Sequence, residues 1–189
     1  MTIINGLHLV KTMKQRYIIG CTGHIKLSRL KNFDEAEVRE KVRERLLSLG
    51  EKYCVELRCG LAYGADSLFA EEALSCGVEV CAVLPCPEEE FAAEQIDGGV
   101  LFNRLIQRAS HIIIAQDLVN RYEGISANIV QNCNELWAIW DGKVLPLTDD
   151  GGGDINRGGT YHTMLLAREE NKPVYIVNEG ERHFIKWNC

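Results

Sequence analysis

Glycines and short polar side chains that could hold a ligand recur in this sequence beside apolar segments. The stretch GLAYGAD, residues 60–66, places two glycines and an aspartate between an apolar run and a helical pattern. Glycine lets backbone amides approach a ligand closely, and an aspartate can accept hydrogen bonds from hydroxyls or exchange a proton. Similar stretches are CTGH (21–24), PCPEEEF (85–91), DG (141–142) and RGGT (157–160). The candidate ligand-binding residues are Gly20, Thr22, Gly23, His24, Gly60, Ala62, Gly64, Asp66, Pro85, Asp141, Gly142, Gly158, Gly159 and Thr160.

Each candidate also has a purely structural interpretation. Gly20 and Gly23 could turn the chain, and Asp66 could complement the dipole of the helix it begins. Asp141 could shape a turn, and Thr160 could cap its helix. The set is more informative than its members, because otherwise four strand ends would carry turn chemistry by coincidence. Glycine-rich turns and helix N-termini favour anions, so the set predicts a phosphate-bearing ligand.

The elements that must position these residues alternate along the chain. Short apolar segments predict strands, and segments with a helical apolar period lie between them. Strands separated by helices indicate parallel crossovers, so we expect one three-layer, doubly wound α/β domain with a core over about residues 15–180. In such sheets ligands bind beyond the carboxyl ends of the strands, where the strand order reverses. The expected strands are 17–20, 54–59, 79–84, 111–115, 135–140 and 173–178, and the expected helices 34–50, 65–76, 99–110, 120–134 and 159–171.

Three local patterns carry more detailed expectations. Asn32 and Glu35 are spaced like a capping pair, and Gly50 is expected to stop the first helix. Glu56 and Arg58 alternate with apolar residues, which predicts a strand with one polar, partly exposed face. The segment PLTDDGGGDINRGG, residues 146–159, is expected to be a mobile loop that closes over the ligand.

Composition and charge narrow the class of partner. The apolar fraction of 46% and the charged fraction of 25% are typical of globular proteins and argue against a disordered chain. The 27 acidic residues exceed the 21 basic ones and no basic run is present, so nucleic acid is a disfavoured partner. No segment approaches the roughly 18 apolar residues that span a membrane. We therefore expect a cytoplasmic protein without a membrane partner.

Eight cysteines are present, but none forms a C-x-x-C pair. Most lie in apolar segments, so we expect reduced and mostly buried thiols, and a zinc site is the minority interpretation. Cys21 and Cys86 each follow a predicted strand, and both are candidates for exposure at a site. Four histidines share no metal-ligand spacing, and no metal or other cofactor is expected; they are His8, His111, His162 and His183.

Four segments together resemble the SLOG superfamily, the Rossmann-like group that includes the LOG phosphoribohydrolases and the core of DprA. They are GLAYGADSLFAEEAL, VEVCAVLPCPEEEF, LWAIWDG and RGGTYHTMLLAREENKPVYIV, and the match covers about residues 15–180. The resemblance implies a nucleotide or nucleotide derivative as ligand. It implies a phosphate near Gly158, Gly159 and Thr160, and a sugar or base near Gly23, Gly64 and Asp66. It also implies a homodimer, for which the apolar helix 120–134 is a candidate interface.

One departure from that family bears on catalysis. LOG enzymes carry P-G-G-x-G-T-x-x-E, whose glutamate helps to cleave the N-glycosidic bond. Here the leading proline is absent and Thr163 stands three residues after Thr160, where the glutamate would be. Asp66 and Asp141 are the remaining candidates for a catalytic carboxylate, with Glu90 as a further carboxylate at a strand end.

Three functions therefore remain open. The preferred one is a sensor or carrier module that binds an ADP-ribose-like or nucleoside phosphate ligand without chemistry. The alternative is a nucleotide N-glycosidase related to the phosphoribohydrolases. A DprA-like partner of single-stranded DNA is the minor alternative, because the chain is acidic.

Overall fold

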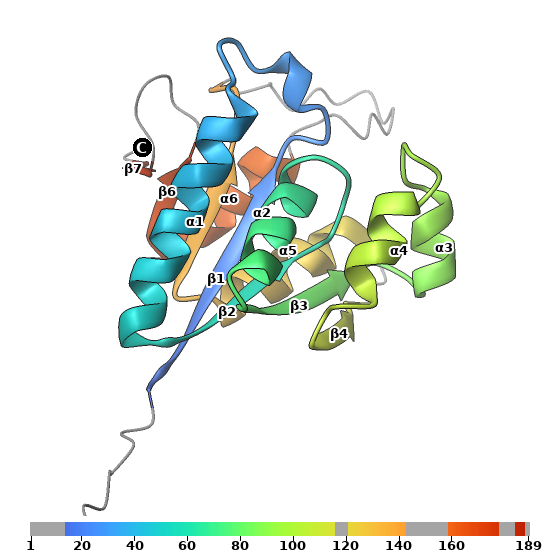
Figure 1. The fold of residues 1–189 in the computed structure, drawn as a ribbon. Coiled ribbons are helices and arrows are strands. Elements are labelled where there is room, and N and C mark those ends of the chain that lie inside the picture. The colour runs from blue at the N-terminus through green and yellow to red at the C-terminus, as the bar shows by residue number, and fades with distance from the viewer. Residues whose placement is uncertain (1–13, 116–120, 143–158, 178–183, 188–189) are drawn as a thin grey trace, which may run out of the picture.

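The computed structural model describes residues 14–115, 121–142, 159–177 and 184–187, and a β-sheet lies between two layers of helices (Figure 1). Its seven strands have the order β4-β3-β2-β1-β5-β6-β7. All neighbours pair in parallel except β6 and β7, which are antiparallel. This confirms the predicted doubly wound α/β fold with a mainly parallel sheet. The strands are β1 (Arg16–Gly23), β2 (Cys54–Cys59), β3 (Glu79–Leu84), β4 (His111–Ile114), β5 (Glu135–Ile139), β6 (Val174–Ile176) and β7 (Ile185–Lys186).

The helices divide between the two faces of the sheet. Figure 1 shows α1 and α2 in front of the sheet and α5 and α6 behind it, while α3 and α4 lie at the β3–β4 side. This division follows from right-handed crossovers, because the chain moves from β1 toward β4 and then, in the opposite direction, from β5 toward β7. The helices are η1 (Leu27–Arg29, a 3-10 turn), α1 (Glu35–Lys52), α2 (Ala65–Ser75), α3 (Glu88–Ala93), α4 (Val100–Ile106), α5 (Arg121–Asn132) and α6 (Gly159–Glu169).

Helix α1 shows why its residues are helical and corrects two expectations about its ends. Its buried stripe is Val38, Val42, Leu46 and Leu49, the i, i+4 pattern of an amphipathic helix. The N-cap is Asp34, whose side chain accepts a hydrogen bond from the Glu37 amide at 3.1 Å, and not the predicted Asn32–Glu35 pair. The helix also runs through Gly50 to Lys52. A glycine weakens a helix by only about 1 kcal/mol, which the packed stripe overcomes.

Apolar side chains fill the space on both faces of the sheet. On the α1–α2 face, Phe69 packs against Trp137 of β5 with ring centroids 6.2 Å apart, and both are fully buried. On the other face, Ile129 and Val130 of α5 are buried in a second cluster with Met164 of α6. The apolar side of α5 is therefore used inside the molecule. A homodimer stays a prediction, and it needs a surface other than this apolar side of α5.

Strand β2 corrects the expectation of a partly exposed polar face. Glu56 and Arg58 are 1% and 8% exposed. The strand lies between β1 and β3 in the sheet, and every residue of it after Cys54 is buried. Instead the charges pair, with Arg58 Nη2 2.9 Å from Glu56 Oε1 and Arg16 bonded to the other carboxylate oxygen. This pairing satisfies the hydrogen bonds of the buried charges without water.

Five cysteines of the described residues are buried, as expected. Exposure of Cys21 and Cys86, however, was a wrong expectation. Cys21 lies inside β1 at 1% exposure, and Cys86 is 6% exposed beneath the start of α3. Among the described residues, no helix is long and apolar enough to cross a membrane. The predicted loop 146–159 lies outside the described residues except for Gly159.

Candidate functional site

The carboxyl ends of β1, β2, β3 and β5 meet at one edge of the sheet. The strand order reverses between β1 and β5, because the chain passes from β1 to β2 on one side and from β5 to β6 on the other. The crevice at such a reversal is where open parallel sheets bind ligands. Thr22 and Gly23 end β1 at this point, with Thr22 paired in register with Ala138 of β5.

His24 and Asp141 connect the two strand ends across the reversal. The His24 amide donates to the Ile139 carbonyl at 3.1 Å, which holds the chain beside β5. The Asp141 amide donates to His24 Nε2 at 3.1 Å, and the Asp141 carboxylate lies 3.3 Å from the same nitrogen. A neutral imidazole accepts the amide proton, whereas a protonated one forms an ion pair with the carboxylate. Both side chains are partly exposed, at 27% and 19%, and can therefore meet a ligand.

Asp66 lies in the first turn of α2, beside the end of β2. Its Oδ2 accepts a hydrogen bond from the Gly60 amide at 3.0 Å, and the Ala62 amide is a second donor. Burial of the carboxyl group raises its pKa to about 7, although the two amides act in the opposite direction. The residue as a whole remains partly exposed. A carboxyl group that titrates near neutrality can hold, accept or release a proton.

Three of the predicted glycines are explained by packing. The prediction that Gly20 ends its strand is wrong, because Gly20 lies inside β1. A Cβ at this position would come within 2.7 Å of Ile129. A Cβ on Gly23 would lie 2.3 Å from the Cβ of Ala65. Gly64 has a φ of +101°, and the carbonyl oxygens of His24 and the next residue lie within 2.5 Å of its missing Cβ. Gly20 thus allows α5 to pack closely on β1, and Gly23 and Gly64 allow the start of α2 to do so, so a ligand is not needed to explain them.

Gly159 differs because nothing in the described structure requires a glycine there. It opens α6, and no atom of the described residues lies within 4 Å of the Cβ it lacks. Thr163 donates from Oγ1 to the Gly159 carbonyl at 2.7 Å and lies 2.8 Å from Ser126 Oγ of α5. Thr163 is buried, and its bond to Gly159 stabilises the first turn of α6. Thr163 is the residue that stands where the LOG motif has its glutamate. Thr160 is also buried.

The remaining candidates occupy the rim of the same edge. Ala62 lies in the loop between β2 and α2, and its carbonyl accepts from both the amide and the hydroxyl of Ser67. Pro85 is buried directly after β3. Gly142 follows Asp141 with a φ of +76° and open space around it. Gly158 lies outside the described residues. The structure thus brings candidates from four strand ends to one edge.

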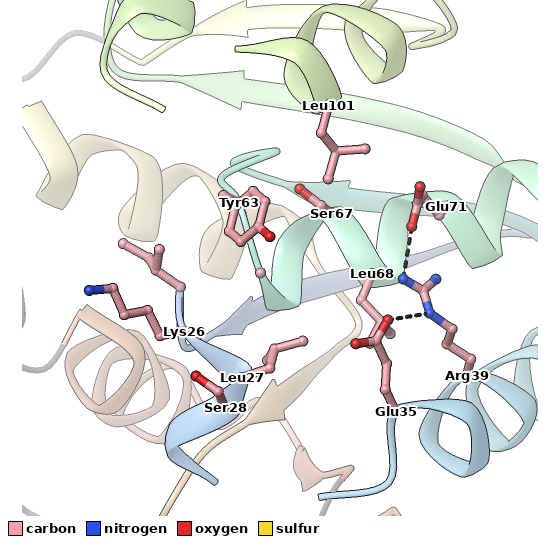
Figure 2. A pocket seen from close by; sticks show the side chains of 12 residues that line it. Lys26, Leu27, Ser28, Glu35, Arg39, Tyr63, Ser67, Leu68, Glu71 and Leu101 are labelled. Carbon is pink, nitrogen blue, oxygen red and sulfur yellow. Dashed lines mark hydrogen bonds and ion pairs between the residues drawn. The ribbon is translucent and has the colours of Figure 1, made fainter. Parts of the chain in front are cut away.

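A separate pocket of about 280 Å³ lies on the outer side of α2 (Figure 2). Of the predicted site residues, only Gly64 lines it. Arg39 crosses its wall, with Nε 2.9 Å from Glu35 and Nη2 2.8 Å from Glu71. Sequence reasoning missed this pocket, because α1, α2 and α4 each contribute only part of it. Its lining is Ile25, Lys26, Leu27, Ser28, Glu35, Arg39, Tyr63, Gly64, Ser67, Leu68, Glu71 and Leu101.

The fold of this chain is similar to those of several known proteins. No protein-family model and no curated protein sequence matches the chain. Solved structures do. DprA, the DNA processing protein A of Streptococcus pneumoniae, superposes with a TM-score of 0.57 at 15% identity over 88% of this chain and 51% of its own. The chain therefore shares the fold of this part of DprA.

Two further solved structures share this fold. The molybdenum cofactor carrier protein of Chlamydomonas reinhardtii has a TM-score of 0.52 at 17% identity, over 86% of this chain and 77% of its own. The structural-genomics target TM1055 has a TM-score of 0.51 at 19% identity, over 84% and 72%. The present chain spans only about half of the pneumococcal DprA. At such identities the likeness establishes the fold, and the site must carry any argument about function.

Proposed function

We propose that this protein is a sensor or carrier module that binds a nucleotide-like small molecule at the carboxyl edge of its sheet. The observation that carries the proposal is the gathering of His24, Asp66 and Asp141 from three strand ends around the reversal between β1 and β5. Such a crevice with a few converging polar groups is the usual form of a small-molecule site. That one neighbour is named as a cofactor carrier supports binding without chemistry.

The geometry suggests a role for each part of this site. The first turn of α6 receives the phosphate, because its amides start a helix and Gly159 leaves their approach open. The start of α2 is less suited to that role, since the amides of Ala65 and Ser67 already donate to the His24 and Ala62 carbonyls. Asp66 accepts a hydrogen bond from the sugar or base. His24 and Asp141 lie between the two and contact the sugar hydroxyls.

Blocking the approach to α6 tests this arrangement. Gly159→Val adds a branched side chain where the phosphate would meet the backbone, so we expect affinity for adenosine monophosphate or ADP-ribose to fall at least tenfold. Calorimetry measures it, with Gly50→Ala as the matched control because Gly50 also has open space around it but lies within α1. Equal affinities in wild type and Gly159→Val would contradict phosphate binding at the first turn of α6.

The second candidate function is nucleotide N-glycosidase activity, which the near-neutral pKa of Asp66 favours. We expect no release of free base from nucleoside monophosphates or ADP-ribose, because Thr163 replaces the LOG glutamate and is buried against Ser126. Chromatography of reaction mixtures measures base release. Release by the wild type that is lost in Asp66→Asn, with ligand binding retained, would replace the carrier proposal by the hydrolase.

Binding of single-stranded DNA remains the minor alternative, and its support is the likeness of fold to DprA, a DNA processing protein. The acidic net charge of −6 disfavours it. Described arginines on α1 are also engaged, with Arg39 and Arg43 both bonded to Glu72. A fluorescently labelled oligonucleotide that bound this protein with a steep salt dependence would favour this alternative.

A further inference from the structure

Three potential metal ligands gather where β3 leads into α3. The Cys86 thiol and the carboxylates of Glu90 and Glu94 each bring a ligand atom within 4.8 Å of the other two. Glu90 and Glu94 are four residues apart, on one side of α3 and its C-cap, and Cys86 lies just before the N-cap of that helix. Pro85 and Pro87 flank the cysteine, and their rings restrict the backbone on either side of it. This cluster was not predicted from the sequence, because it contains neither a C-x-x-C pair nor histidines at metal-ligand spacing.

Side chains from other elements hold α3 in place. The Tyr122 hydroxyl of α5 donates to Glu94 Oε2 at 3.2 Å. Gln95 ties the end of α3 to the loop after β2, because its Oε1 accepts from the Tyr63 amide at 3.0 Å. The Phe91 ring meets Phe102 of α4 edge-on at 5.3 Å between centroids. Contacts of this kind orient metal-binding carboxylates and limit the reorganisation that binding requires.

Burial divides the three ligands into an inner and an outer part. Cys86 is 6% exposed, whereas Glu90 and Glu94 are exposed. The sulfur therefore lies on the protein side and the carboxylates on the solvent side, with access for an ion. Two carboxylates and a thiol that ionises on binding together attract a cation. A thiolate prefers a zinc-like ion to Mg²⁺ or Ca²⁺, which are bound by oxygen ligands.

We propose that Cys86, Glu90 and Glu94 bind a divalent transition-metal ion of the zinc class and leave one coordination position open to solvent. In tetrahedral zinc sites neighbouring ligand atoms are roughly 3.5 Å apart, so small side-chain rotations from the observed arrangement are enough. Three protein ligands and one exchangeable position are the pattern of an open zinc site rather than a closed structural one. Glu90 is then a metal ligand and not a catalytic carboxylate.

The test is titration of the reduced full-length protein with Co²⁺, which substitutes for Zn²⁺ and reports thiolate ligation through a near-ultraviolet charge-transfer band. We expect saturation at one equivalent, displacement by Zn²⁺, and tighter binding as the pH rises, because binding releases the thiol proton. Cys86→Ser removes the charge-transfer band. Glu90→Gln and Glu94→Gln, which change only surface carboxylates, weaken Co²⁺ binding at least tenfold.

Two matched controls separate this site from unspecific binding. Glu89→Gln alters a neighbouring exposed carboxylate of the same helix, and Cys54→Ser removes an exposed thiol at the start of β2. Both should bind Co²⁺ as the wild type does, and circular dichroism checks that each variant is folded. The proposal is overturned if the band persists in Cys86→Ser, if Glu89→Gln weakens binding as much as Glu90→Gln, or if the wild type does not saturate. The result does not depend on nucleotide binding, because the metal alone is the probe.

Discussion

Asp66 shows how strongly the pKa of a candidate site residue depends on its surroundings. The stretch GLAYGAD predicts its place at a strand end, and the structure has it there, in the first turn of α2. Its raised pKa could not be predicted from that stretch, because it depends on how deeply the folded chain buries the carboxyl group. The same limit explains Gly20 and Gly23, whose type suggested ligand contact and whose neighbours reveal packing.

The pKa of about 7 predicts how Asp66 affects stability. Its folded-state pKa lies above the unfolded value near 4, so the folded protein binds this proton more tightly. The resulting stabilisation is complete below about pH 4 and is lost as the pH rises toward 7. Compared with Asp66→Asn, the wild type should lose up to about 1.4 kcal/mol per pH unit across that interval. Urea unfolding of both proteins at several pH values measures this, and a difference independent of pH would contradict the raised pKa.

At the scale of elements, close contact between α2 and β1 builds the candidate site. Gly23 ends β1 directly beneath Ala65, and the Ala65 amide donates to the His24 carbonyl at 3.1 Å. The order of strands and helices was predictable from apolar periodicity. Helix α3 and strand β7 were not, because they have six and two residues and are too short to show a period. The burial of Glu56 in β2 was also unpredictable, since an alternating pattern does not say which face is covered.

Two glycine substitutions test the contact between α2 and β1. Gly23→Ala places a methyl group 2.3 Å from the Ala65 Cβ and 2.9 Å from the Ile139 carbonyl, so the helix or the strand must move. We expect a loss of about 2–4 kcal/mol in the free energy of unfolding. Gly50→Ala, inside α1 with open space around it, should instead add about 0.5–1 kcal/mol. Chemical denaturation measures both, and a neutral Gly23→Ala would show that this contact is not tight.

At the scale of the molecule, the edge of the sheet and the pocket on α2 are two distinct places where a ligand could bind. The first was predicted from the sequence, because parallel strands bring their carboxyl ends to one edge. The second is lined by residues 25–28 after β1 and by residues of α1, α2 and α4, and it emerged only from the packing of these segments (Figure 2). We propose that the nucleotide-like ligand binds at the edge of the sheet.

Amide chemical shifts measured by NMR during titration with adenosine monophosphate and ADP-ribose distinguish the two places most directly. We predict that the amides of His24, Asp66 and Thr160 shift together and saturate at a single affinity for at least one of these ligands. The amides of Arg39 and Leu101, which line the pocket on α2, should change little. Saturable shifts confined to the pocket on α2, or the absence of any saturable shift with either ligand, would contradict nucleotide binding at the sheet edge.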